Sequence, residues 1–77
     1  MKTTTNTNEI KRGDFIIGQY AFGCICGVVE EIKSKIVIIN KCEQWYNEFT
    51  LTDTKVNVTK SRINQIGLDE NQRIIKL

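Results

Sequence analysis

The chain has 77 residues, of which 40% are hydrophobic and 26% charged, and its formal net charge is +2. A chain of this length forms one small domain that removes only about 60% of its extended surface from water, which excludes a multidomain enzyme and a nucleotide-binding sheet of several units. There is no His, so no side chain titrates near neutral pH without a shifted pKa, and no imidazole can bind a metal.

The aliphatic residues favour a β fold. Twelve Ile and five Val stand against three Leu and one Ala, and β-branched side chains suit the pleated surface of a sheet. Residues 1–9 are polar, and we predict that they form a disordered lead-in. A single domain then occupies residues 10–77.

The first three predicted strands follow one another closely. Asp14–Gln19 is the first, directly after a turn at residues 11–13. Cys24–Lys33 is the second and contains Gly27, where a missing side chain is typical of a bulge or a bend. A short turn leads from it into the third strand, Lys35–Asn40.

Two further strands are predicted as a hairpin. A polar and aromatic connection at residues 41–47 precedes Glu48–Thr52, in which apolar and polar side chains alternate. Asp53–Thr54 then forms a turn, and Lys55–Val58 alternates again. This pair is the clearest predicted hairpin of the chain.

The pattern changes after this hairpin. Residues 59–66 suit a short helical turn that places Ile63 and Ile66 on one side and ends at Gly67. The final segment, Arg73–Leu77, is a candidate for a last strand.

Short strands with a bent second strand make a small curved sheet, which hides its edges best by closing on itself. The segments 10–16, 27–32, 55–58 and 61–66 resemble those of the SH3-like small β-barrel superfamily, in its bacterial, KOW and Tudor-like forms. The resemblance implies a mostly β fold, a five-stranded antiparallel barrel with one short helical turn near the C-terminus. It implies little about function, because such folds host many functions.

Three predicted strands are apolar on both faces, at residues 15–17, 24–26 and 36–39. Strands of this kind are usually covered on both sides. Either the C-terminal residues 74–77 cover the second face, or a second copy of the chain does. We favour the second copy, because so short a chain has little mass to spare, and therefore predict a homo-oligomer.

The three cysteines raise the question of a metal site. Cys24 and Cys26 share one strand face and could bind zinc with Cys42, but structural zinc sites use four Cys or His ligands. We favour buried apolar thiols and expect no cofactor, with a metal shared across an oligomer as the alternative. The odd number of cysteines and the lack of an N-terminal apolar segment indicate a cytoplasmic protein. The longest apolar run, residues 36–39, is too short to span a membrane.

We expect no enzymatic activity. The sequence has no Ser-His-Asp set, Walker motif or dinucleotide fingerprint. One enzyme, the trimethoprim-insensitive type of dihydrofolate reductase, builds a pore from four SH3-like barrels through a Val-Gln-Ile-Tyr strand motif. Residues 56–59 read Val-Asn-Val-Thr and lack its Gln and Tyr, which argues against this role.

Four aromatic side chains fall in predicted loops, Tyr20 and Phe22 after the first strand and Trp45 and Tyr46 after the third. Exposed aromatics are typical anchors of binding sites, and these loops can lie close together in an SH3-like fold. We predict one binding face, with polar contacts from Glu43, Gln44 and Asn47. The alternative is that these aromatics cover the small core.

Charge is segregated along the chain, with a net +2 over residues 1–13, −3 over 14–53 and +3 over 54–77. The candidates for phosphate or nucleic-acid contacts are Lys11, Arg12, Lys55, Lys60 and Arg62. Because the central segment is acidic, we favour a protein partner over nucleic acid. A phage or mobile-element protein that inhibits a host defence factor, or binds its nucleotide signal, stays an alternative.

Overall fold

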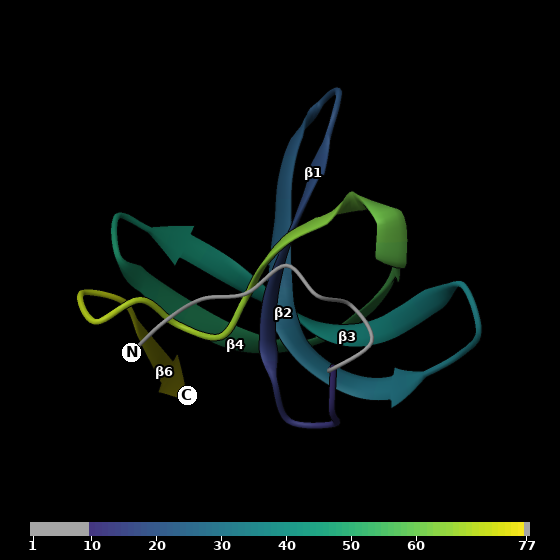
Figure 1. Cartoon of the computed structure of the whole chain (residues 1–77). Helices are drawn as coiled ribbons and strands as arrows, with labels where there is room; N and C mark the ends of the chain where they lie inside the picture. The colour runs from purple at the N-terminus through teal and green to yellow at the C-terminus, as the bar shows by residue number, and fades with distance from the viewer. Residues whose placement is uncertain (1–9, 77) are drawn as a thin grey trace.

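The computed structural model describes residues 10–76 (Figure 1). Its elements are β1 Phe15–Tyr20, β2 Gly23–Ile32, β3 Ile36–Trp45, β4 Glu48–Thr59, the 3-10 turn η2 Lys60–Arg62, β5 Ile63–Ile66 and β6 Arg73–Lys76. The six strands form one sheet in the order β5-β1-β2-β3-β4-β6, which curls into a half-barrel (Figure 1). The predicted mostly β fold is confirmed. The predicted lead-in, residues 1–9, and Leu77 lie outside the described residues.

Strand β2 changes neighbours halfway along its length. Its first half pairs with β1, and its second half, from Gly27 to Ile32, pairs with β3. Figure 1 shows the β1–β2 hairpin crossing the direction of β3 and β4. Gly27 permits this crossing, because a Cβ at this position would lie 2.2 Å from the Asn40 carbonyl oxygen. The bulge predicted at Gly27 lies instead between Val29 and Glu31.

The predicted hairpin at Asp53–Thr54 is wrong, because both residues lie inside β4. Between the pairs Asn40↔Lys55 and Cys42↔Leu51, residues 52–54 of β4 stand opposite a single residue of β3. The chain therefore bulges without reversing its direction. The Thr52 hydroxyl fixes this bulge, since it donates to the Lys41 carbonyl oxygen at 2.7 Å and accepts from the Thr54 amide at 3.2 Å.

The predicted connection at residues 41–47 is mostly strand as well. β3 continues to Trp45, where it pairs with Glu48 at the start of β4. Only Tyr46 and Asn47 remain between the two strands. The result is a tight hairpin in place of a loop.

The segment after β4 is helical only over Lys60–Arg62. Ile63 and Ile66 lie in β5, which pairs with β1, and both are buried. Alternation alone would send them to opposite faces, but a register shift opposite Ile17 and Gly18 leaves Asn64 unpaired. Ile63 and Ile66 therefore share a face because of a bulge in β5. The helical turn that we predicted for this purpose is wrong.

The sheet is antiparallel except at β6, which pairs with β4 in parallel. Its two faces carry separate clusters of buried apolar side chains, since the neighbours Phe15 and Ile16 point in opposite directions. One cluster consists of Ile10, Ile16, Val29, Val37, Ile39, Val58, Ile63 and Ile66. The other consists of Phe15, Cys26, Cys42 and Phe49, with Ile17, Leu51, Leu68 and Ile74 packed against it.

The C-terminal segment covers the part of the second face around Phe49, through Leu68 and Ile74. A single chain therefore supplies some of the cover for which we predicted a second copy. Ile36 and Ile38 of β3 belong to neither buried cluster, and Ile32 is 38% exposed, so the homo-oligomer stays a prediction. No helix within residues 10–76 is long and apolar enough to cross a membrane.

Candidate functional site

The β3–β4 turn presents two adjacent exposed aromatic side chains. Trp45 is 69% exposed and Tyr46 is 78% exposed, and their rings form a T-shaped pair with centroids 4.9 Å apart. Tyr46 has a φ of 55°, in the left-handed region that favours glycine. A large exposed side chain in a strained turn is not explained by packing, and strain of this kind is often found at functional sites.

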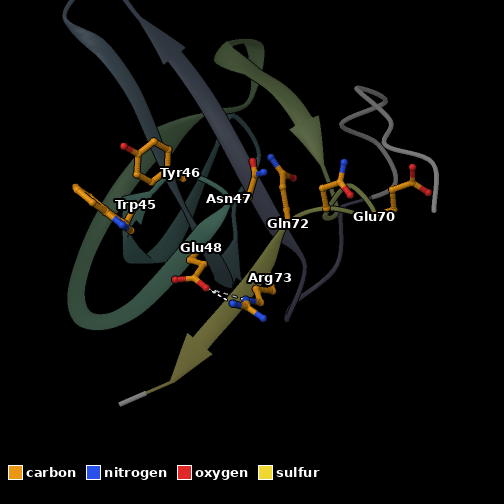
Figure 2. Close-up of a pocket in the computed structure, with 8 residues that line it drawn as sticks. Trp45, Tyr46, Asn47, Glu48, Glu70, Gln72 and Arg73 are labelled. Carbon is orange, nitrogen blue, oxygen red and sulfur yellow. Dashed lines mark hydrogen bonds and ion pairs between the residues drawn. The ribbon is translucent and has the colours of Figure 1, made fainter.

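An open pocket of about 530 Å³ adjoins this aromatic pair (Figure 2). Its lining residues are Trp45, Tyr46, Asn47, Glu48, Glu70, Asn71, Gln72 and Arg73. They come from the β3–β4 turn and from the loop that leads from β5 into β6. In Figure 2 the aromatic rings stand on one side of the pocket, with Gln72 and Glu70 on the other. We call this site the Trp45–Tyr46 pocket.

The parallel pairing of β6 with β4 joins the two walls. The Arg73 amide donates to the Asn47 carbonyl oxygen at 3.0 Å, and the Arg73 guanidinium forms an ion pair with Glu48 (Figure 2). On the far wall, the Gln72 side-chain oxygen accepts from Gln65 at 2.7 Å and from the Asp69 amide at 2.9 Å. The pocket is thus shaped by fixed backbone and side-chain contacts.

The polar residues predicted around this pair lie close to it. Asn47 lines the pocket, and the Gln44 side-chain amide donates to the Tyr46 carbonyl oxygen at 3.0 Å, which braces the turn. Glu43 is exposed on β3, with its carboxylate 4.0 Å from Lys41 Nζ.

The far wall was missed by sequence reasoning. The polar turn at residues 69–71 is visible in the sequence. Its place beside Trp45 follows from the β4–β6 pairing, which no local pattern signals.

The other predicted aromatics form a separate group. Tyr20 and Phe22 stack at 5.3 Å with an interplanar angle of 19°, and neither lines the Trp45–Tyr46 pocket. The Tyr20 hydroxyl accepts a hydrogen bond from the Thr59 amide at 3.0 Å, and Arg62 Cζ lies 5.6 Å from the Tyr20 ring centroid. The structure therefore divides the predicted aromatic face into two sites.

The predicted basic residues are divided too. Arg12 and Lys55 line a second pocket of about 600 Å³ together with Glu30, Glu31, Ile32 and Ile38. Lys55 forms an ion pair with Glu30, and Arg12 Nε donates to the Glu30 carbonyl oxygen at 2.9 Å. The Lys11 amide donates to the Asp14 carboxylate at 2.9 Å. Arg12 and Lys55 thus share a pocket with two carboxylates, whereas Lys60 and Arg62 lie on η2.

Two of the three cysteines are core residues. Cys26 and Cys42 are buried, and Cys26 Sγ lies 3.5 Å from the Cys42 carbonyl oxygen. Burial, together with the neighbouring Cys42 and Cys24, raises the pKa of Cys26 to about 12, and burial also raises the pKa of Cys42. Cys24 is exposed and contacts Gln19 Oε1 at 3.0 Å. Across residues 10–76, no group of three or more His, Cys, Asp or Glu side chains is placed to hold a metal ion.

Comparison of the chain with protein-family models, curated proteins and solved structures found no match.

Proposed function

We propose that this protein is a non-enzymatic binding module that recognises a segment of another protein through the Trp45–Tyr46 pocket. The observation that carries the proposal is the exposed aromatic pair, held in a strained two-residue turn beside an open pocket. Aromatic side chains of this kind dominate the binding energy of many interfaces, because they bury a large area at little cost in conformational entropy.

The charge around the pocket favours a basic segment. Two carboxylates, Glu48 and Glu70, line it against one lining cation, Arg73, which Glu48 binds, so the lining carries a net negative charge. A Lys or Arg side chain could lie over the Trp45 or Tyr46 ring, an interaction worth about 0.5–2 kcal/mol. Phosphate groups would be repelled by the carboxylates, so this pocket suits a peptide better than nucleic acid.

We further propose that the half-barrel belongs to the SH3-like superfamily, which the strand pattern resembles and with which the curled sheet is compatible. The three cysteines are free thiols, which supports action in a reducing compartment such as the cytoplasm.

A displayed library of short random peptides tests the proposal. Peptides selected on the wild-type protein should be rich in Lys and Arg. They should bind the Trp45→Ala variant about tenfold or more weakly, because an aromatic anchor typically contributes about 2 kcal/mol or more. Thermal unfolding of this variant should stay within a few degrees of wild type, since Trp45 is 69% exposed and belongs to neither core cluster.

Phe22→Ala is the matched control, because it removes an equally exposed aromatic side chain outside the pocket. It should bind the selected peptides as wild type does. Selected peptides that are acidic, or that bind Trp45→Ala with unchanged affinity, would contradict the proposal.

A further inference from the structure

A second aromatic surface lies where the tip of the β1–β2 hairpin meets η2. Phe22 is 77% exposed, with one face of its ring stacked on Tyr20. Tyr20 is itself fixed, because its ring packs against the first core cluster and its hydroxyl accepts from the Thr59 amide. Phe22 therefore presents a ring face to solvent from an anchored support.

A guanidinium lies against this aromatic stack, and a second cation is close to it in the chain. Arg62 lies over the Tyr20 ring, at 5.6 Å from its centroid. Lys60 is on the same 3-10 turn, and its amide donates to the Lys35 carbonyl oxygen at 2.9 Å, which brings the β2–β3 turn alongside. We call the surface made by Tyr20, Phe22, Lys60 and Arg62 the basic ledge.

The basic ledge has no nearby acidic residue along its own segments. Residues 15–29, which contain the hairpin tip, and residues 54–68, which contain η2, include no Asp or Glu. Residues 54–68 carry Lys55, Lys60 and Arg62. The charge of the ledge is thus opposite to that of the Trp45–Tyr46 pocket, and the two surfaces suit different ligands.

We propose that the basic ledge binds single-stranded nucleic acid. An unpaired base stacks on the open face of Phe22 and so extends the Tyr20–Phe22 stack, while Arg62 and Lys60 bind the flanking phosphates. Stacking on an aromatic ring tolerates any base but needs the base unpaired, which favours a single strand over a duplex. Lys11, Arg12 and Lys55 are not part of this surface, because they lie beside Asp14 and Glu30.

Fluorescence anisotropy with labelled oligothymidylate and oligouridylate tests the proposal. Binding should be measurable at low salt and should weaken steeply as salt rises. Phe22→Ala should weaken oligonucleotide binding at least about fivefold, which is the effect expected when one base stack is lost. Phe22→Trp keeps an aromatic ring at this position and should bind as wild type does. Arg62→Ala should also weaken binding and should lower the salt slope by about 1, as expected for one lost phosphate contact.

Two control variants separate local from general effects. Lys41→Ala removes one positive charge outside the ledge, at a residue that lies near Glu43, and Tyr46→Ala removes an exposed ring from the other site. Both should bind the oligonucleotides within about twofold of wild type.

Each of the following results would overturn the proposal: no binding at low salt, unchanged affinity in Phe22→Ala, equal competition by a duplex of the same length, or equal competition by thymidine monophosphate. Phe22→Leu keeps most of the side-chain volume but lacks the ring. Its affinity for the oligonucleotides tests the role of the ring if Phe22→Ala does not fold. Wild-type affinity in a folded Phe22→Leu would also overturn the proposal.

Discussion

At the scale of single residues, Tyr46 combines two properties that usually exclude each other. It is a large aromatic residue, and its φ of 55° lies in the left-handed region, which costs an L-residue other than glycine about 1–2 kcal/mol. The Gln44 side chain and the Trp45 ring support it in this conformation. A sequence under pressure for stability alone would place Gly or Asn there.

Two substitutions at this residue separate strain from contact. Tyr46→Gly and Tyr46→Ala both remove the ring, but only glycine relieves the backbone. We expect the glycine variant to have the higher free energy of unfolding, by about 0.5–1 kcal/mol, in urea denaturation. Both should lose affinity for the selected peptides. An alanine variant as stable as the glycine variant would show that the turn is not strained.

The aromatic residues of the site could be found in the sequence, but their partners could not. Trp45 and Tyr46 stand between predicted strands, and loop aromatics suggest a binding surface. Glu70 and Arg73 enter the site through the parallel pairing of β6 with β4. Pairing between segments this far apart depends on the whole sheet, and it leaves no periodic signal at the residues themselves.

At the scale of elements, β4 shows why a bulge was mistaken for a turn. Phe49 and Leu51 alternate on one face, and Val56 and Val58 alternate on the other. Between the two runs the apolar side chains change from odd-numbered to even-numbered positions, and both a hairpin and a bulged strand are compatible with this change, as is the Asp-Thr sequence. The fold class was therefore predicted better than the strands themselves. The two strands predicted within residues 48–58 are the single strand β4, and the residues of β5 were predicted to form a helical turn.

The crossing of β2 and β3 gives a prediction at this scale. Gly27→Ala would place a methyl group 2.2 Å from the Asn40 carbonyl oxygen, a backbone atom that can move only with its strand. We expect a loss of about 2 kcal/mol or more in the free energy of unfolding, from urea denaturation.

Gly18→Ala is the comparison, because its nearest contact is the Val58 Cγ1 side-chain atom at 2.9 Å. A side chain can shift more readily than a backbone oxygen, so the loss should be smaller. Equal losses in the two variants would mean that the close approach of β2 and β3 does not limit the fold.

At the scale of the whole molecule, much of the excess of Ile and Val has an explanation within one chain. Each face of the sheet carries its own cluster of buried side chains, although Ile36 and Ile38 belong to neither. The composition predicted that both faces must be covered. It could not show that Leu68 and Ile74 reach the second face, because that depends on where β6 joins the sheet.

The two aromatic sites also divide the surface by charge. The Trp45–Tyr46 pocket is bordered by carboxylates and the basic ledge by cations, while the net charge of the chain is only +2. The net charge therefore conceals a difference in charge between the two surfaces. A module of this kind would present a peptide site and a nucleic-acid site on one small scaffold.

The most direct test of the peptide site is a two-dimensional NMR titration of the ¹⁵N-labelled protein with one selected basic peptide. The chain has a single Trp, so its indole N–H gives one isolated signal from the aromatic wall of the pocket. We predict that this signal and the amides of residues 45–48 and 70–73 shift on binding, while the amides of Phe22 and Arg62 stay in place. An unchanged Trp45 signal, with the shifts concentrated at residues 20–22 and 60–62, would contradict the account.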